Sequence, residues 1–250
     1  MIFDTHCHLN DEKLIQNVDE IIKNAQEVGV NRFLVIGWDK ESSLTAIKLA
    51  EQYEGVYAAI GFHPENIFDA TEDDFQETMK YIDHPKVVAV GEIGLDYHYE
   101  GYNKDHQKEL FIKQLKLAEK YDLPVVIHSR EATQDTIDIL KQFKLKGVIH
   151  SFSGSYETAQ IYINMGYKLG INGIITFKNS NLSNTISRLN PADIVLETDS
   201  PYLTPEPFRG QKNESKNIIY IAEKVASIYD ISLEKLSEIT NKNVKQIFDI

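Results

Sequence analysis

Two histidines near the start of the chain have a spacing that could hold a metal ion. The segment Ile2–His6 has the composition of a strand and continues into Cys7 and His8. Because side chains alternate between the two faces of a strand, His6 and His8 share one face and Cys7 takes the other. The two histidines lie roughly 6.6–7 Å apart along the strand, so their imidazoles can converge on one ion. The pair alone is equally compatible with two half-buried polar residues that bind nothing.

Four further polar residues follow apolar, strand-like runs. Glu92 follows 87–90, His128 follows 125–127, His150 follows 147–149 and Asp199 follows 194–198. A charged side chain at the end of a buried strand must be solvated, paired or bound to an ion, because unpaired burial is costly. With His6 and His8 they make a nitrogen and carboxylate ligand set without thiolates. Such a set suits Zn, Mn, Co, Ni or Fe, with Mg at carboxylate-rich positions.

One division of these ligands predicts two divalent metal ions per chain. The first ion would be held by His6, His8, Glu92 and Asp199, and the second by Glu92, His128 and His150, with Glu92 as the bridge. Two such ions would lower the pKa of a shared water and clamp an oxyanion. Asp199 is the candidate to orient that water and accept its proton. A mononuclear site is the alternative, and Asp199 could instead cap the segment after its strand.

Strand-like runs alternate with amphipathic helical segments along the whole chain. Strands are expected at 2–6, 32–37, 56–62, 87–92, 125–128, 147–150, 167–172 and 194–198. Helices are expected at 14–28, 44–52, 73–82, 106–121, 133–143, 157–165, 183–189, 218–229 and 233–248, with Ser232 as the N-cap of the last. Strands that are apolar on both faces predict a parallel sheet covered by helices.

The positions of the polar residues favour a closed barrel over an open, doubly wound sheet. The metal-ligand candidates and His63 all lie at or just beyond the C-terminal ends of the expected strands. A barrel builds its site at that end from loops around the ring, whereas an open sheet uses one crevice and fewer strands. We therefore predict an α/β protein with a (β/α)8 TIM barrel, as a single domain over residues 1–250.

The charge balance limits the kinds of partner. The formal net charge is −12, which argues against wide, non-specific binding to duplex nucleic acid. A compact site whose positive charge comes from metal ions and a few basic side chains remains compatible with it. One cysteine, Cys7, excludes an internal disulfide framework and fits a reducing compartment. With no signal-peptide pattern and no long apolar run, we expect a cytoplasmic protein that does not associate with membranes.

Several short motifs occur in a specific order from His6 to the last helix. They are His6–His8, Gly61–Pro64, Gly91–Tyr97, Leu123–Arg130, His150–Gly154, Thr176–Asn179, Glu197–Pro201, Thr204–Gly210 and Lys212–Glu214. In this order the chain resembles the TatD-type deoxyribonucleases among the metal-dependent, amidohydrolase-like barrels. The family's ligand positions fall on His6, His8, Glu92, His128, His150 and Asp199. The resemblance implies hydrolysis of phosphodiester bonds in nucleic acid, with trimming of single-stranded DNA, or RNA, from the 3′ end. No obligate protein partner is evident from the sequence.

Residues outside the ligand set have expected roles in that reaction. We expect His63 to hydrogen-bond the phosphate or protonate the leaving oxygen, the alternative being a rim histidine bonded to backbone. Basic residues near the expected mouth could bind phosphate or be solvated surface charges: Arg130, Lys178, Arg209 and Lys212. Aromatic residues in the same loops could stack unpaired bases or simply pack: Tyr97, Phe152, Phe177, Tyr202 and Phe208.

Two other functions fit the same residues. One is a small-molecule metallohydrolase acting on an amide, lactone or phosphoester, and the other is a metal-stabilised binding protein without catalysis. Glu92 weakens the first, because related binuclear barrels often carry a carboxylated lysine at that place. The presence of Asp199, the candidate proton acceptor, together with a complete set of ligands argues against a binding protein without catalysis. The chain departs from the family pattern at Glu65, where many relatives have histidine, and at Ser215, where proline is usual.

Overall fold

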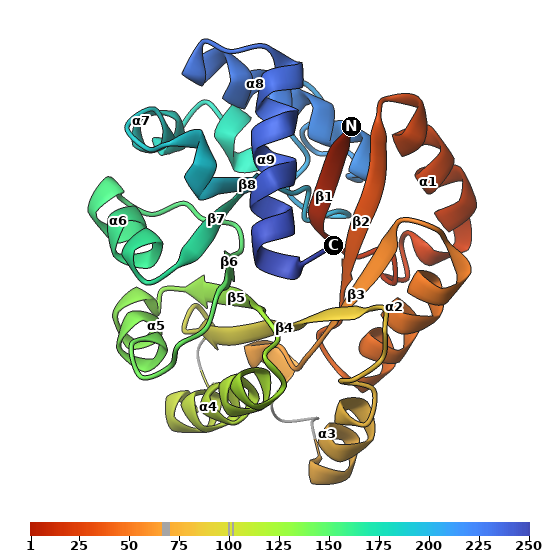
Figure 1. The fold of residues 1–250 in the computed structure, drawn as a ribbon, viewed down its shortest axis with the longest axis vertical. Coiled ribbons are helices and arrows are strands. Elements are labelled where there is room, and N and C mark those ends of the chain that lie inside the picture. The colour runs from red at the N-terminus through yellow and green to blue at the C-terminus, as the bar shows by residue number, and fades with distance from the viewer. Residues whose placement is uncertain (67–70, 100, 102) are drawn as a thin grey trace.

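Eight parallel strands pair in chain order from β1 to β8. The computed structural model describes residues 1–66, 71–99, 101 and 103–250. The strands are β1 (Ile2–Cys7), β2 (Val30–Ile36), β3 (Val56–Ile60), β4 (Val87–Asp96), β5 (Val125–Arg130), β6 (Gly147–Ile149), β7 (Tyr167–Ile171) and β8 (Ile194–Leu196). Helices surround the ring of strands in Figure 1. The predicted TIM barrel is confirmed.

The helices follow the expected order, and most begin or end within a few residues of the expected positions. They are α1 (Val18–Glu27), α2 (Lys40–Gln52), α3 (Glu72–Met79), α4 (Lys104–Tyr121), α5 (Thr133–Leu140), α6 (Tyr156–Asn164), α7 (Leu182–Ile186), α8 (Ile218–Tyr229) and α9 (Leu233–Phe248). Short 3-10 helices lie at Ile15–Asn17, Pro64–Asn66, Gly173–Thr176, Pro191–Asp193 and Ser215–Asn217. Ser232 caps α9 as predicted, because its side chain accepts a hydrogen bond from the backbone N–H of Lys235.

The ring closes between β1 and β8. Cys7 and Ser200 form an isolated parallel bridge, and the N–H of His8 donates to the carbonyl of Ser200 at 2.8 Å. Buried Asp4 adds a side-chain contact, accepting from the backbone N–H of Thr198 at 2.9 Å and bonding its hydroxyl at 2.6 Å. These contacts join segments about 190 residues apart in the sequence, and they hold the ends of β1 and β8 together.

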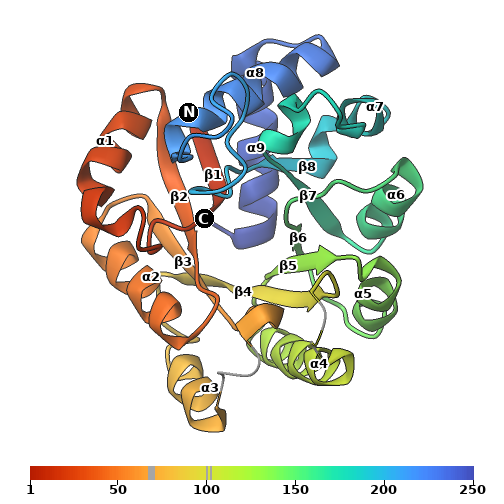
Figure 2. The same ribbon diagram turned by 180° about the vertical axis from the view of Figure 1, so that it is seen from behind.

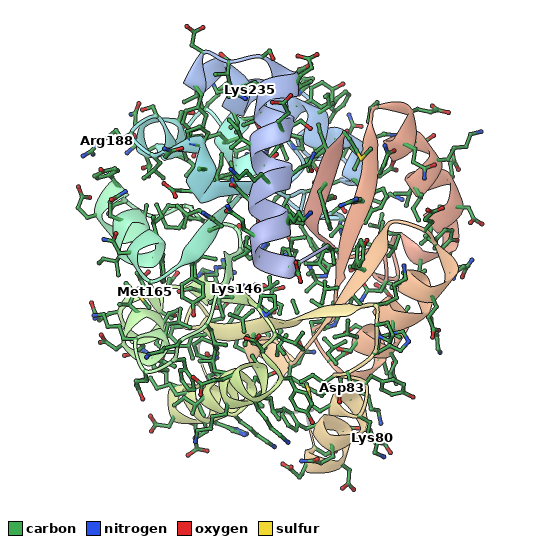
Figure 3. All side chains as sticks on the ribbon, viewed as in Figure 1. Lys80, Asp83, Lys146, Met165, Arg188 and Lys235 are labelled. Carbon is green, nitrogen blue, oxygen red and sulfur yellow. The ribbon has the colours of Figure 1, made fainter. Side chains whose placement is uncertain are left out.

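One end of the barrel is covered by α9. Apolar side chains of α9 (Val244, Ile247 and Phe248) pack against a cluster inside the barrel that includes Phe3 and Val195. The helix also contacts the beginnings of strands: Asn241 donates to the carbonyl of Met1 and Asn243 to that of Ile194. Lys146, labelled in Figure 3, donates to the carbonyl of Gln246. In Figure 1 α9 crosses in front of the ring, and in Figure 2 it lies behind it. The opposite end is left for the loops that follow the strands.

The outer faces of the strands pack against the helices. The buried face of α1 (Val18, Ile21, Ile22 and Ala25) belongs to this layer, as does Cys7, which is fully buried. Val28, expected on the same face, is 40% exposed, because α1 ends at Glu27 and the chain turns at Gly29. Gly29 has φ +87, which glycine adopts without strain.

Strand β4 is longer than predicted. It was expected to end at Glu92, yet it continues to Asp96 because Ile93–Asp96 pair with Ile127–Arg130 of β5. The register shifts between Val90 and Ile93, so Glu92 sits at a bulge within the strand. Asp96 therefore ends the strand, and both carboxylates lie near the open end of the barrel. In the described parts of the chain no helix is long and apolar enough to cross a membrane.

Candidate metal centre

A cavity of about 380 Å³ opens at the end of the barrel opposite α9. It is lined by His8, Asp11, Trp38, His63, Glu65, Asn66, Glu92, Asp96, His128, Arg130, His150, Asp199 and Tyr202. Figure 2 shows this end, with the segment that follows β8 in front. The six predicted ligands come from β1, β4 and β5 and from the residues just after β1, β6 and β8. The parallel strands thus bring together side chains that are far apart in the sequence.

Five of these side chains form two overlapping groups of possible ligands, His6 with His8 and Glu92, and His6 with His150 and Asp199, and within each group the ligand atoms lie within 4.8 Å of one another. His6 Nε2 lies 3.2 Å from His8 Nε2, 3.3 Å from Glu92 Oε2 and 3.7 Å from Asp199 Oδ1. His150 Nε2 lies 3.8 Å from both Glu92 Oε1 and Asp199 Oδ1. Ligands at about 2.0–2.1 Å from a tetrahedral zinc ion would be about 3.3–3.4 Å apart. The spacing and chemistry of these donors therefore fit a metal ion.

Neighbouring groups fix which ring nitrogen of two histidines carries the proton. His8 Nδ1 lies 3.3 Å from the carbonyl oxygen of Ile36, which can only accept, so Nδ1 holds the hydrogen. Within the described residues His150 Nδ1 forms no hydrogen bond of good geometry but lies 2.9 Å from the carboxylate oxygen Oε1 of Glu197, whose charge favours a proton on this nitrogen. In the neutral form of each ring Nε2 is then left with its lone pair, directed into the cluster. This arrangement, in which a carbonyl or carboxylate orients a histidine, is the usual support for a metal-ligating imidazole.

His128 has a different environment. Its Nδ1 lies 2.9 Å from Glu92 Oε1 and its Nε2 lies 2.9 Å from Asp96 Oδ2. Burial alone would lower the pKa of His128, but the bonds to Asp96 and Glu92 raise this pKa to about 9. The ring is therefore an imidazolium held between two carboxylates. Its role as a metal ligand stays a prediction, as does the division of the ligands between two ions.

His63 is a hydrogen-bond donor to the cavity. Its Nδ1 accepts from the backbone N–H of Glu65 at 3.1 Å, so the hydrogen of the neutral ring lies on Nε2. That atom lies 3.7 Å from Glu92 Oε1. Burial and the charge of His128 lower the pKa of His63 to about 3, which keeps the ring neutral. The Nε2–H of this tautomer can donate to a substrate, and the ligand atoms of His63, Glu92 and His128 also lie within 4.8 Å of one another, close enough to hold a metal ion.

Among the described residues the carboxylates of the site form ion pairs with imidazoles, and the charge of Arg130 acts on Asp96. Although burial opposes ionisation, His150 and the other imidazoles hold the pKa of Glu92 well below its usual range and lower that of Asp199. The charges of Glu197, Glu92 and Asp199 outweigh burial and raise the pKa of His150 to about 10. Within the described residues, no lysine or arginine pairs with Glu92, Asp96, Glu197 or Asp199. Such a concentration of buried carboxylates is complementary to divalent cations.

The expected substrate-binding residues are divided between two cavities. Arg130 lines the cavity with the metal candidates, whereas Lys178 and Arg209 line a second one. Lys212 lies outside both and donates to the carbonyl of Lys13. Among the aromatic candidates Tyr202 is 46% exposed at the first cavity and Phe177 lines the second. The others pack within the protein: Phe152 is buried, Phe208 contacts Tyr220, and the hydroxyl of Tyr97 donates to Asp135.

Sequence reasoning missed three residues of the site. Asp96 was quoted only within a motif, and its bond to His128 depends on the extension of β4. Glu197 was likewise quoted only within a motif, and it lies just after β8, which ends at Leu196. Trp38, the single tryptophan, follows β2, and its ring lies 5.1 Å from that of His8. No pattern in the sequence indicated its place at the cavity.

Comparisons with known proteins agree with this geometry. A family model described as TatD related DNase matches residues 3–249. YabD of Bacillus subtilis, named as an uncharacterized metal-dependent hydrolase, is 41% identical over 254 residues, covering 100% of both chains. YcfH of Escherichia coli K12, named likewise, is 32% identical and covers 100% of this chain and 96% of its own. The crystal structure of YjjV, a TatD homologue from E. coli K12, superimposes with a TM-score of 0.95 at 30% identity, covering 100% and 98% of the two chains. The chain therefore belongs to the TatD related DNase family.

Proposed function

We propose that this protein is a metal-dependent hydrolase that cleaves phosphodiester bonds and trims single-stranded DNA from its 3′ end. The observation that carries the proposal is the group of imidazole and carboxylate donors 3.2–3.8 Å apart at the open end of the barrel. The direction of trimming and the preference for DNA rest on the family resemblance. The names of YabD and YcfH, as metal-dependent hydrolases, support the coarser part of the proposal.

The proposed metal ligands are the six predicted residues: His6, His8, Glu92, His128, His150 and Asp199. Divalent ions bound there would lower the pKa of a water molecule and neutralise charge on the phosphate. Glu92 lies within 4 Å of His6, His128 and His150, a central position that suits the proposed bridge. Two ions per chain are proposed, drawn from Mg, Mn, Zn, Co and Ni according to availability.

The remaining roles belong to side chains around the cluster. Asp199 is half-buried, with its carboxylate toward His8, and we assign it to orient the attacking water and take its proton. The Nε2–H of His63 would donate to a phosphate oxygen on which charge develops. Arg130 lines the same cavity and is exposed, so its guanidinium can reach a phosphate of the substrate.

The experiment is a nuclease assay with single-stranded DNA carrying a 3′ label, run beside RNA of the same sequence and a panel of esters and amides. Purified protein is assayed with each divalent metal in turn. We expect labelled mononucleotides to be released first from DNA. Cleavage of the panel alone would favour the small-molecule hydrolase, and inactivity with every metal would favour a binding protein.

The variant Asp199→Asn tests the role of Asp199, because asparagine keeps the side-chain volume but cannot accept the proton of the attacking water. Turnover should fall by about 10²–10⁴-fold, while the circular dichroism spectrum stays unchanged. Undiminished hydrolysis would remove Asp199 from the mechanism.

A further inference from the structure

A second cavity, of about 490 Å³, lies at the same end of the barrel as the metal centre. Its lining comes from the loop after β6 (Ser153), the segment after β7 (Ile174, Phe177–Asn181) and the segment after β8 (Glu206, Arg209). The last two segments are joined by a hydrogen bond of 2.9 Å from the N–H of Glu206 to Thr176 Oγ1. The cavity shares no lining residue with the first one.

The two cavities are close together because one segment lines both. Tyr202 lines the metal cavity, and Glu206, four positions later, lines the second. Four residues span at most about 14 Å. A chain of a few nucleotides with one phosphate at the metal centre can therefore extend into the second cavity.

Arg209 is held in an orientation suited to bind an anion. Its guanidinium carbon lies 3.7 Å from the centre of the Phe177 ring, so the planar group rests on the aromatic face. The side chain is exposed, and no carboxylate of the described residues forms an ion pair with it. A stacked guanidinium keeps its N–H groups free at its edge, where they match two oxygens of a phosphate.

The other lining residues complete a polar groove. Lys178 adds a second positive charge, and neutral donors come from Asn179, Asn181 and Ser153. Glu206 is the one carboxylate in the lining and partly offsets these charges. The lining therefore carries two positive charges and one negative charge, whereas the whole chain has a net charge of −12.

We propose that this groove binds a phosphate of single-stranded DNA a few nucleotides away from the bond that is cleaved. The proposal rests on the proposed function, because it takes the DNA strand to pass from one cavity to the other. A phosphate bound in the groove would make the protein bind oligonucleotides more tightly than dinucleotides, which are too short to reach it. Arg209 supplies the main contact, and Phe177 holds its guanidinium in place.

The test measures KM for single-stranded DNA of two, four, eight and twelve nucleotides with wild type and Arg209→Gln. For wild type, KM should fall as the strand grows from two to a few nucleotides and then level off. Arg209→Gln should raise KM about 3- to 10-fold for eight nucleotides, and much less for the dinucleotide. The slope of log KM against log salt should decrease by about 0.7, the loss of one phosphate contact on a single strand. Glu206→Gln, which removes the opposing charge, should lower KM for the longer strands.

Arg188→Gln is the matched control. The Arg188 guanidinium also lies 3.7 Å from an aromatic ring, that of Tyr156, but it lines neither cavity and lies at the outer edge of the molecule in Figure 3. It should behave as wild type on every length. An equal effect of Arg209→Gln on all lengths, or none on any, would overturn the proposed groove.

Binding separates this proposal from the proposed function. Fluorescence anisotropy with 5′-labelled strands in chelator requires no cleavage. If wild type cleaves neither DNA nor bis(4-nitrophenyl) phosphate with any metal, the nuclease proposal fails, while weaker binding of eight nucleotides by Arg209→Gln still supports the groove. If Arg209→Gln and wild type bind all lengths equally, the groove proposal fails, whatever the nuclease assay gives.

Discussion

His150 Nδ1 lies 2.9 Å from Glu197 Oε1, and both side chains are buried where the barrel opens. The same carboxylate accepts from the backbone N–H of Ser151 at 2.7 Å, so Glu197 is fixed from two sides. Gly170 of β7 makes room for it, because a Cβ there would lie 2.2 Å from Glu197 Oε2. Glu197 therefore positions the His150 ring, with Nε2 directed toward Glu92 and Asp199.

Replacing Glu197 by Gln should weaken metal binding about 10- to 100-fold. The amide keeps the size of the side chain, but it no longer fixes the tautomer of His150 as a carboxylate does. Competition with a chromophoric chelator measures the affinity. Glu131→Gln is the control, because Glu131 makes the same contact with His98 Nδ1, at 2.7 Å, in an exposed position. Equal affinities for wild type and Glu197→Gln would exclude this role for Glu197.

His63→Ala should lower kcat/KM for phosphodiesters by about 10²–10³-fold and leave metal affinity unchanged. The N–H of Glu65 bonds Nδ1 and so leaves the hydrogen of the neutral ring on Nε2, which is the basis of the proposed donor role of His63. His84→Ala serves as the control, because His84 Nδ1 accepts from the N–H of Lys86 in the same way, before β4. Loss of one metal equivalent in a titration of His63→Ala would show instead that His63 is a ligand.

The barrel and the convergence of the six side chains could be predicted from sequence because both follow from local patterns. Apolar runs mark strands, and parallel strands bring their C-terminal ends to one rim. The contacts of Asp4 and Asp96 could not be predicted, since each depends on pairing between distant segments: Asp4 meets Thr198 across the closure of the ring, and Asp96 meets His128 through the extension of β4. The tautomer of His63 likewise depends on a backbone turn that side-chain spacing does not report.

Metal binding should release protons and strengthen as the pH rises toward the raised pKa values of His128, about 9, and His150, about 10. In the metal-free protein burial opposes the charge of His128, but Asp96 and Glu92 raise its pKa to about 9, so the ring is protonated below that pH. If His128 is a ligand, the metal must displace this proton, and affinity should rise up to about tenfold per pH unit for each proton released. Isothermal titration calorimetry in buffers of different ionisation enthalpy counts the protons.

Asp96→Asn tests the cause of this pH dependence. It removes one of the two carboxylates that bond the His128 ring, so the pKa of His128 should fall and fewer protons should be released on metal binding between pH 7 and 9, while His150 still releases its own. An affinity that does not change between pH 7 and about 9 in wild type would contradict the proton count and the ligand roles of both His128 and His150, whereas equal proton release by wild type and Asp96→Asn would contradict the role of His128 alone.

The contribution of Asp4 to the free energy of unfolding should fall as the pH rises from about 4 to about 7, opposite in sign to that of His63, whose pKa is lowered to about 3. Burial raises the pKa of Asp4 to about 7, although its hydrogen bonds to Thr198 oppose this rise. The folded protein therefore binds this proton more tightly than the unfolded chain does. Protonated Asp4 therefore stabilises the folded protein in full below the ordinary carboxyl pKa of about 3.9. This stabilisation is lost as the pH rises to the raised pKa of about 7, at up to about 1.4 kcal/mol per pH unit. Asp4→Asn cannot titrate, so the difference in free energy of unfolding between wild type and the variant, measured in urea on chelator-treated protein, should fall as the pH rises through this range. Parallel pH profiles for the two proteins would show that Asp4 is ionised in the folded barrel and that its carboxylate is stabilised by Thr198.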